Sequence, residues 1–342
     1  MGRAGLRGVK AALIAVAVLA TFGIGFFVGR ELYSPASPAP DSSTQYSLDS
    51  FTKVSPDLLR YRLLRSFTVE LREPRGIACS AAETVYVCGD RELLALTPEG
   101  KEKRRYALDG EPRCVAVSPD GRLFVGMETH VDVLDPSSGQ VEQWPDLGPQ
   151  AIITSIGAGP VEVFVADAGN REVLRFDRGG RLAGRVGKGF TVPSPFFDVV
   201  ASPDDTLWAA DPGRQSVRHY GTGGELLGSW GRSSMEADGF GGCCNPAHIA
   251  QLPCGRIVTS EKGLLRVKVY EPDGRLYAVA ALPRDFPAAE KSLDIATRKA
   301  NGGEILVLVP AARAVRVYAG KGNAGEGNAG KGNANKGGAC DG

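Results

Sequence analysis

The chain has 342 residues, of which 43% are hydrophobic and 23% are charged, and this composition excludes a wholly disordered protein. The 40 Lys and Arg residues balance 39 Asp and Glu residues, so the net charge of +1 gives no reason to expect a nucleic acid as partner. The 45 Gly and 22 Pro residues favour a turn-rich β protein over a helical bundle, and three His leave little room for a multi-histidine metal centre.

The N-terminal region carries an apolar run that is typical of a membrane span. Residues 11–29 contain no charged residue, and as a helix they would reach about 28 Å, enough to cross a hydrocarbon core. Arg3, Arg7 and Lys10 precede the run, so we expect residues 1–10 in the cytoplasm and everything after the span outside it, in a periplasm or on a cell surface. The alternative is a cleaved signal peptide, whose apolar region is usually shorter.

Two further segments have a biased composition. Residues 30–58 follow the apolar run and are rich in Ser and Pro, which predicts an extended spacer between the membrane and the next domain. Residues 320–342 consist mainly of Gly, Asn, Ala and Lys, and we expect this tail to be disordered because it has too little apolar surface to fold.

Between these segments, one pattern of short apolar strands and polar turns recurs six times. The clearest strand of each unit is a mainly apolar run, such as TVYVC, VFVAD or LWAAD. Successive copies of this run start 38 to 50 residues apart. A repeat of this length with several short strands is the signature of a β-propeller blade. The sequence therefore predicts an all-β, six-bladed β-propeller over residues 59–319, preceded by one transmembrane helix.

The last unit ends after its third strand, near Tyr318, and so lacks an outer strand. The segment Leu63–Leu71 alternates partly between apolar and polar residues and precedes the first complete unit. We expect this segment to supply the outer strand of the sixth blade and thereby close the ring.

Three stretches of the repeat resemble the NHL-repeat family of six-bladed propellers: Val161–Gly187, Leu207–Gly231 and Pro246–Leu276. The family pattern has a Pro before the first strand, a turn like SPDG, then a strand that ends in Asp and an Asn- or Arg-bearing turn. The blades at 74, 112, 161, 207 and 246 carry much of this pattern, whereas the last blade lacks the Asp and the polar turn. The resemblance implies the propeller fold. It does not select an activity, because such propellers host binding, scaffold, lyase and hydrolase functions.

The inner strands of a propeller begin at the mouth of its central channel, so one position in each blade should face that mouth. Alignment of the segments PRGIA, PRCVA, FFDVV, PAHIA and SLDIA places Gly76, Cys114, Asp198, His248 and Asp294 at equivalent positions, with Thr154 as the candidate in the third blade. Thiolate, imidazole and carboxylate are the ligands of zinc. The resemblance permits such a site, since some family members hold metals with channel His and acidic groups.

The sequence thus predicts a site for a divalent metal such as zinc. Its candidate ligands are the thiol, imidazole and carboxylate groups of this ring together with an adjacent cysteine pair: Cys114, Asp198, Cys243, Cys244, His248 and Asp294. The alternative is structural, because polar groups that line a channel commonly bind water and Cys often acts as a small buried apolar residue. Neither a CxxC nor an HExxH motif is present to decide between them.

Two other features of the mouth have more than one interpretation. Cys243 and Cys244 could form a strained, redox-active vicinal disulfide instead of binding metal. Arg75 and Arg113 each follow a Pro at the start of an inner strand and are candidate ligand-binding residues for an anion, with a solvated turn residue as the alternative.

These features lead to two functional hypotheses. The first is a membrane-anchored, extracytoplasmic propeller that binds an unidentified protein or small-molecule ligand at its channel mouth, as a recognition or scaffold module without turnover. The second is a metal-dependent or redox-active enzyme, similar to a lyase or hydrolase, with its centre at the Cys, His and Asp residues of the channel. Nucleic acid is not expected as a partner of either.

Overall fold

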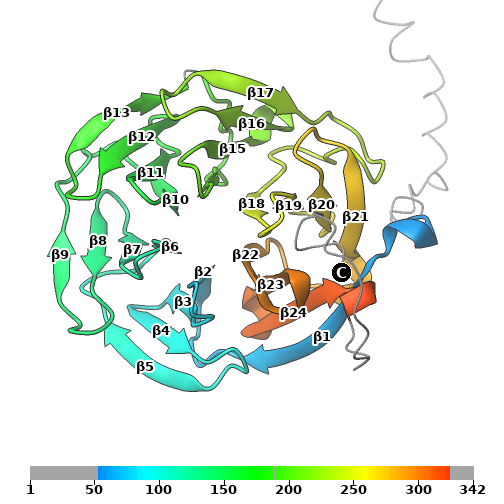
Figure 1. The fold of residues 1–342 in the computed structure, drawn as a ribbon, viewed down its shortest axis with the longest axis horizontal. Coiled ribbons are helices and arrows are strands. Elements are labelled where there is room, and N and C mark those ends of the chain that lie inside the picture. The colour runs from blue at the N-terminus through cyan, green and yellow to red at the C-terminus, as the bar shows by residue number, and fades with distance from the viewer. Residues whose placement is uncertain (1–52, 188, 324–342) are drawn as a thin grey trace, which may run out of the picture. The chain divides into compact units, whose positions relative to one another are not determined.

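The computed structural model describes residues 53–187 and 189–323, which form a closed ring of six four-stranded antiparallel sheets (Figure 1). This confirms the predicted all-β, six-bladed propeller. The predicted membrane span at residues 11–29 lies outside the described residues, as do most of the spacer and most of the tail. Within the described part of the chain, no helix has the length and apolar character that a membrane crossing needs.

The first three blades follow one another along the chain, and in each blade the strands run in order from the channel to the rim (Figure 1). Blade 1 contains β2 (Pro74–Cys79), β3 (Val85–Gly89), β4 (Glu92–Leu96) and β5 (Glu102–Ala107). Blade 2 contains β6 (Cys114–Val117), β7 (Leu123–Gly126), β8 (Val131–Leu134) and β9 (Val141–Gln143). Blade 3 contains β10 (Ile153–Ala158), β11 (Glu162–Asp167), β12 (Glu172–Asp177) and β13 (Leu182–Val186).

The other three blades complete the ring. Blade 4 contains β14 (Val199–Ala201), β15 (Leu207–Asp211), β16 (Ser216–Tyr220) and β17 (Leu226–Trp230). Blade 5 contains β18 (His248–Gln251), β19 (Ile257–Ser260), β20 (Val267–Tyr270) and β21 (Leu276–Ala281). Blade 6 contains β22 (Asp294–Arg298), β23 (Glu304–Val309), β24 (Ala314–Gly320) and β1 (Tyr61–Thr68). Short 3-10 helices stand at η2 (Pro56–Leu58), η3 (Pro212–Arg214), η4 (Pro283–Asp285), η5 (Ala300–Gly302), η6 (Pro310–Ala312) and η7 (Lys321–Asn323).

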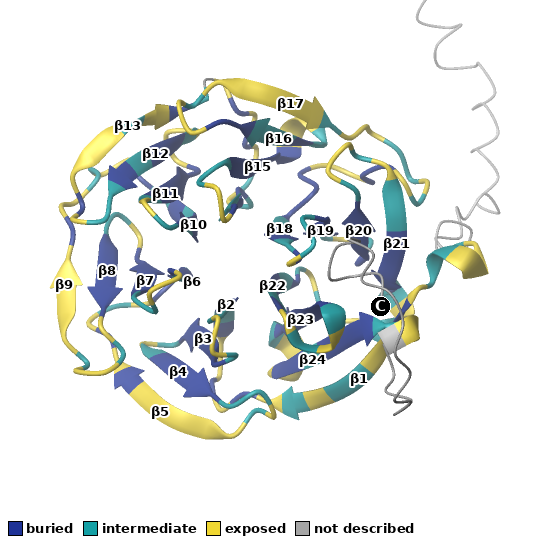
Figure 2. Cartoon of the chain, in the orientation of Figure 1, coloured by how far each residue is buried: buried dark blue, intermediate teal, exposed yellow. Residues whose placement is uncertain are grey.

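Burial decreases from the middle of each blade to its rim (Figure 2). Every residue of the second strands β3, β7 and β23 is buried, whereas β9 at the rim is exposed throughout. A second strand packs against the neighbouring blades on both of its faces, so both sets of alternating side chains must be apolar. This explains why the second strands are the continuous apolar runs that make the repeat visible in the sequence.

The ring is closed by the first strand of the domain. β1 pairs antiparallel with β24, from Tyr61 opposite Gly320 to Thr68 opposite Ala314, so the predicted closure of blade 6 by an N-terminal strand is confirmed. The strand begins and ends earlier than predicted. Val69 and Leu71, which the prediction placed in the strand, are buried beside Leu94 and Leu308 in an apolar cluster below it.

A buried charge cluster fixes the long segment between β17 and β18, residues 231–247. Glu261 accepts hydrogen bonds from the backbone N–H of Gly241 (2.9 Å) and from Arg266 (2.5 Å to Nε), and its Oε2 also lies 3.3 Å from the Lys268 Nζ. Arg266 and Lys268 in turn donate to the carbonyl of Gly239. The side chains of Glu261, Arg266 and Lys268 are fully buried. Their hydrogen bonds to the backbone of Gly239 and Gly241 fix the segment that leads to β18.

Candidate functional site

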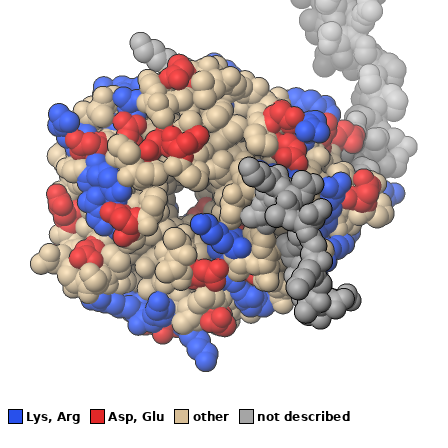
Figure 3. Space-filling view, in the orientation of Figure 1, with Lys and Arg blue, Asp and Glu red and all other residues tan. Residues whose placement is uncertain are grey.

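The channel at the centre of the ring is open, as Figure 3 shows, and three ionisable residues stand where inner strands begin. Asp198 directly precedes β14, while His248 and Asp294 are the first residues of β18 and β22. All three line a channel cavity of about 200 Å³, together with Cys114 and Thr154. The predicted register of the inner strands therefore places these residues at one level of the channel.

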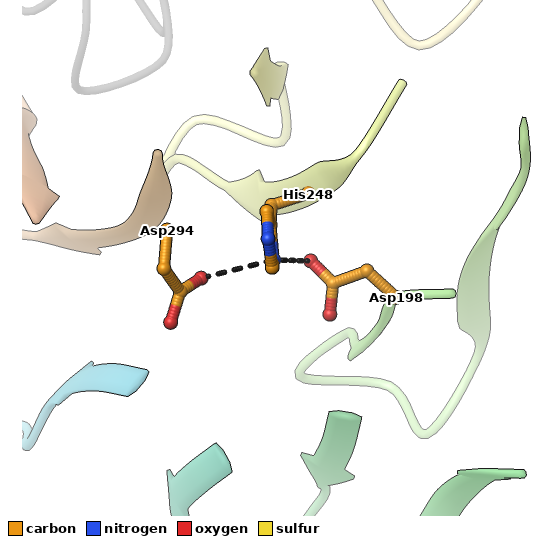
Figure 4. A group of neighbouring side chains, drawn as sticks. All are labelled: Asp198, His248 and Asp294. Carbon is orange, nitrogen blue, oxygen red and sulfur yellow. Dashed lines mark ion pairs between the residues drawn. The ribbon is translucent and has the colours of Figure 1, made fainter. Parts of the chain in front are cut away.

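The three side chains point toward one another from blades 4, 5 and 6 (Figure 4). The His248 Nδ1 lies 3.3 Å from the Asp294 Oδ1 and 3.5 Å from the Asp198 Oδ2. One ligand atom from each residue lies within 4.8 Å of the other two. The side chains retain 9% exposure at Asp198, 19% at His248 and 17% at Asp294, so the group is reachable from the channel but largely desolvated.

Each carboxylate of this group also joins two blades through backbone hydrogen bonds. Asp198 accepts from its own neighbour Val199 (2.9 Å) and from Ile249 of blade 5 (2.6 Å). Asp294 accepts from Ile295 (2.8 Å) and from Ile77 of blade 1 (2.8 Å). Every carboxylate oxygen thus holds one backbone N–H, which fixes its direction and leaves further acceptor capacity on each oxygen.

The proximity of these groups changes their proton affinities. Burial, and to a smaller extent the charge of Asp198, raise the pKa of Asp294 to about 6, although His248 opposes the shift. Burial disfavours the charged form of His248, but the charges of Asp294 and Asp198 outweigh it, and the pKa of His248 is raised above its ordinary value. The group therefore readily holds a proton near neutral pH, and a cation placed among the three residues would compete with it.

A wider cavity of about 580 Å³ lies at the mouth and shares His248 and Asp294 with the channel. Arg75 and Arg113 line both cavities, as predicted. Each also has a carboxylate partner: Arg75 contacts Glu111 at 2.8 Å and Glu73 at 3.3 Å, and Arg113 contacts Glu128 at 2.8 Å. An anion at the mouth would have to share these guanidinium groups with their present partners.

The cysteines do not join the ionisable group. Of the described residues, only Asp198, His248 and Asp294 form a set of three or more potential metal ligands. The Cys114 sulfur lies against the position where a side chain at Gly126 would begin, so it points into blade 2, and burial raises the pKa of its thiol well above the ordinary value. The Cys114 sulfur therefore does not lie where it could bind a metal together with Asp198, His248 and Asp294, contrary to the prediction from the sequence.

The vicinal cysteines lie in the segment that precedes β18. Cys243 is exposed and Cys244 is buried, and both have free thiols, so the predicted alternative of a vicinal disulfide is not formed. Neither lies with Asp198, His248 and Asp294 in the ligand group. Cys244 adopts a left-handed backbone conformation with φ of 66°.

An aromatic wall of the mouth was not anticipated from the sequence. The ring of Phe196 meets the His248 imidazole edge-on, with ring centroids 6.0 Å apart and planes at 88°. The Lys262 Nζ lies 4.6 Å from the centre of the same Phe196 ring and donates a hydrogen bond to the Ser194 hydroxyl (3.3 Å). The run PSPFFD before Asp198 carries this wall, and its two adjacent aromatics were the available signal.

No protein-family model matches the sequence, and no curated protein matches it. Among solved structures, virginiamycin B lyase from Staphylococcus aureus is similar at 14% identity with a TM-score of 0.53, covering 75% of this chain and 99% of that one. A streptogramin B lyase is similar at 12% identity with a TM-score of 0.54, covering 77% and 99%. A catalytically inactive histidine-to-alanine variant of the Staphylococcus aureus enzyme with quinupristin matches at 11% identity and 0.51, covering 75% and 99%. At these identities, the similarity establishes the six-bladed propeller fold alone.

Proposed function

We propose that this protein is a membrane-anchored, extracytoplasmic propeller that binds a ligand or a protein segment through its channel mouth. The observation that carries the proposal is the mouth cavity of about 580 Å³, which lies within the range of about 300–1,000 Å³ typical of ligand sites. Its wall combines apolar surface at Phe196 with polar groups at Arg113, His248 and Asp294. Convergent polar groups beside an aromatic face are what recognition of a small molecule or peptide requires.

The location belongs to the same proposal. Its support is the uncharged run at residues 11–29 with three positive charges before it, and the Ser- and Pro-rich residues 30–58 that follow. The resemblance of the repeats to the NHL family is compatible with this role, because propellers of that family include binding and scaffold modules. A propeller on a flexible spacer would meet its ligand outside the cytoplasm.

A thermal-shift screen with a defined library of dipeptides, sugars, carboxylic acids and nucleotides tests this function. We expect compounds that raise the melting temperature of the parent but not of Arg113→Gln, which removes a mouth cation. Arg185→Gln is the matched control. Arg185 lies on the rim strand β13, and the substitution removes its positive charge, which is paired with Glu172. Hits that stabilise the parent and Arg113→Gln equally would contradict binding at the mouth.

The second candidate is a metal-dependent enzyme of the lyase or hydrolase type, and the group of Asp198, His248 and Asp294 favours it. An imidazole nitrogen and two carboxylate oxygens suit zinc or manganese. The nitrogen-to-oxygen distances of 3.3 and 3.5 Å are close to the separation of about 3.3 Å between donors of a tetrahedral zinc site. Three similar solved structures are lyases, and one of them is a catalytically inactive histidine variant.

If these residues bind a metal, it would supply Lewis acidity at the mouth. The chain itself would hold the two carboxylates in place through the N–H groups of Ile249 and Ile77 and exclude water on the side of Phe196. Titration of the metal-free protein with Zn²⁺ and Mn²⁺ tests this candidate. His248→Ala should weaken binding at least about tenfold, whereas Cys114→Ser should leave it unchanged. Parent-like binding by His248→Ala would contradict this site.

A further inference from the structure

A separate cavity of about 250 Å³ lies at the junction of blades 5 and 6 and shares no lining residue with the channel or its mouth. Its walls come from the start of β1, the end of β21, the 3-10 helix η4 and the end of β24. The chain end that follows β24 is tied to the chain that precedes β1, because the N–H of Lys321 donates to the carbonyl of Arg60 at 2.7 Å. The cavity therefore forms only when the N-terminal strand has closed the ring.

The cavity has a marked excess of positive charge. Four basic side chains line it, Arg62, Arg284, Arg316 and Lys321, against the single carboxylate of Asp285. That carboxylate is already engaged, because its Oδ2 accepts a hydrogen bond of 2.7 Å from the backbone N–H of Leu282 and caps η4.

The four cations also lack internal counterions. Within residues 53–187 and 189–323, none of them forms an ion pair with a carboxylate. Some other basic side chains of the outer strands are paired, as Arg185 is with Glu172 (2.9 Å) and Arg175 with Glu162 (3.3 Å). Like charges that line one small cavity repel one another unless an anion neutralises them. This arrangement indicates a ligand with at least one negative charge.

A buried hydroxyl provides an independent indication of a ligand. Tyr318 lines the cavity and is only 3% exposed; its hydroxyl oxygen lies beside the Arg316 guanidinium, which is a donor, and its O–H has no acceptor among the described residues. An unpaired buried hydroxyl is costly, so this one needs an acceptor that the surrounding chain does not supply. Burial and the nearby Asp285 raise the pKa of Tyr318 to about 12, although Arg316 opposes the shift, so the hydroxyl stays protonated as a donor.

We propose that this cavity binds a phosphate group. A phosphate presents several oxygens at once, and the forked guanidinium groups of Arg284 and Arg316 suit it better than they suit a monovalent spherical anion. The volume is below the range of about 300–1,000 Å³ for drug-sized ligands and suits a small head group. The phosphate belongs either to a soluble small molecule or to an anionic lipid, which the start of β1 would meet if the preceding residues lead to a membrane.

Calorimetric titration of the full chain with inorganic phosphate tests the site, in dodecyl maltoside micelles at pH 7.5 and at an ionic strength held constant with chloride. We expect one saturable site per chain. The double variant Arg284→Gln/Arg316→Gln should weaken binding at least about tenfold, and Tyr318→Phe, which removes only the hydroxyl, about tenfold. Arg185→Gln is the matched control and should bind as the parent does, because it removes a charge remote from the cavity.

Mixed micelles separate the two sources of phosphate. If the natural ligand is a lipid, addition of phosphatidylglycerol should weaken the apparent affinity of the parent for phosphate, because the lipid head group occupies the site. If the ligand is soluble, the affinity should not change. Absence of saturable phosphate binding, or equal binding by the parent, the double variant and Tyr318→Phe, would overturn the proposal. Tyr318→Phe keeps the ring that packs in the blade, so it carries the test if the double variant does not fold.

Discussion

The Asp198 carboxylate accepts the backbone N–H of Ile249 at 2.6 Å and so joins the inner strand of blade 4 to that of blade 5. The same oxygen lies 3.5 Å from the His248 Nδ1. One side chain therefore serves both the closure of the ring and the ionisable group at the channel. Asp294 has the same double role between blades 6 and 1, through the N–H of Ile77. The site is built from groups that the fold itself requires.

Substitution of Asp198 should test the structural half of this role. Asp198→Asn leaves one acceptor oxygen where two backbone N–H groups, of Val199 and Ile249, need one each. Val199 can still donate to the Ser155 hydroxyl (3.2 Å), but the NH2 group of the Asn side chain would then face a backbone N–H, so we expect a loss of about 1–3 kcal/mol in the free energy of unfolding, measured by urea denaturation. Asp177→Asn is the control, since its exposed turn carboxylate also accepts two N–H groups but water can replace it. Equal losses in both variants would contradict the argument.

The ionisable group should make stability fall as the pH rises. The pKa of Asp294 is raised to about 6 in the folded protein, so the folded state binds the proton more tightly than the unfolded state, and stability is lost between pH 4 and 6. The raised pKa of His248 acts on stability in the same direction. Its contribution to stability is fully present below the ordinary pKa of about 6.5 and is lost as the pH rises through the pKa of the folded protein. Asp294→Asn should flatten the profile of melting temperature against pH between 4 and 8.

His219 offers a control of opposite sign. Burial lowers the pKa of this residue, so its contribution to stability is lost as the pH falls. His219→Gln should therefore make the decline of stability with rising pH steeper, not flatter. Parallel profiles for the parent and Asp294→Asn would show that the channel group does not titrate as the geometry indicates.

Glu261 should be among the most sensitive polar residues of the protein. Among the described residues its carboxylate is the one that forms an ion pair with both buried cations, Arg266 and Lys268, and burial has already lowered the pKa of Lys268 to about 7. Glu261→Gln removes this shared partner from both cations, and we expect a loss of about 3–5 kcal/mol in the free energy of unfolding. Glu172→Gln, which removes the half-buried partner of the exposed Arg185, should cost less than about 1 kcal/mol. A cost at Glu261 as small as at Glu172 would refute the role of the cluster.

Thiol reactivity should distinguish Cys243 from the buried cysteines. Cys243 is exposed, whereas burial raises the pKa of Cys88 to about 12 and leaves its thiol both inaccessible and protonated. Labelling of the native protein with a disulfide reagent should show one rapidly reacting thiol fewer in Cys243→Ser than in the parent. Cys88→Ser should leave the rapid phase unchanged. An identical rapid phase in the parent and Cys243→Ser would indicate that Cys243 is blocked, as in a vicinal disulfide.

The fold and the level of the site in the channel could both be predicted from the amino-acid sequence. Second strands such as β11 and β23 are packed on both faces, so they must be continuous apolar runs, and their spacing reveals the number of blades. The same periodicity aligned Asp198, His248 and Asp294 at the start of inner strands, because equivalent positions of a repeat lie at equivalent heights in the ring.

Only the tertiary structure decided which aligned residues meet. Cys114 shares the register of His248, but its sulfur packs against Gly126 within its own blade, and the direction of a side chain depends on space left by its neighbours. At the junction of blades 5 and 6, Arg62 lies far in the sequence from Arg284, Arg316 and Lys321 and joins them because β1 returns to β24. The sequence repeat determines the periodic features, which are the strands and their register in each blade. Contacts between the first and last strands and between neighbouring blades depend on closure of the ring, and no local sequence pattern encodes that closure.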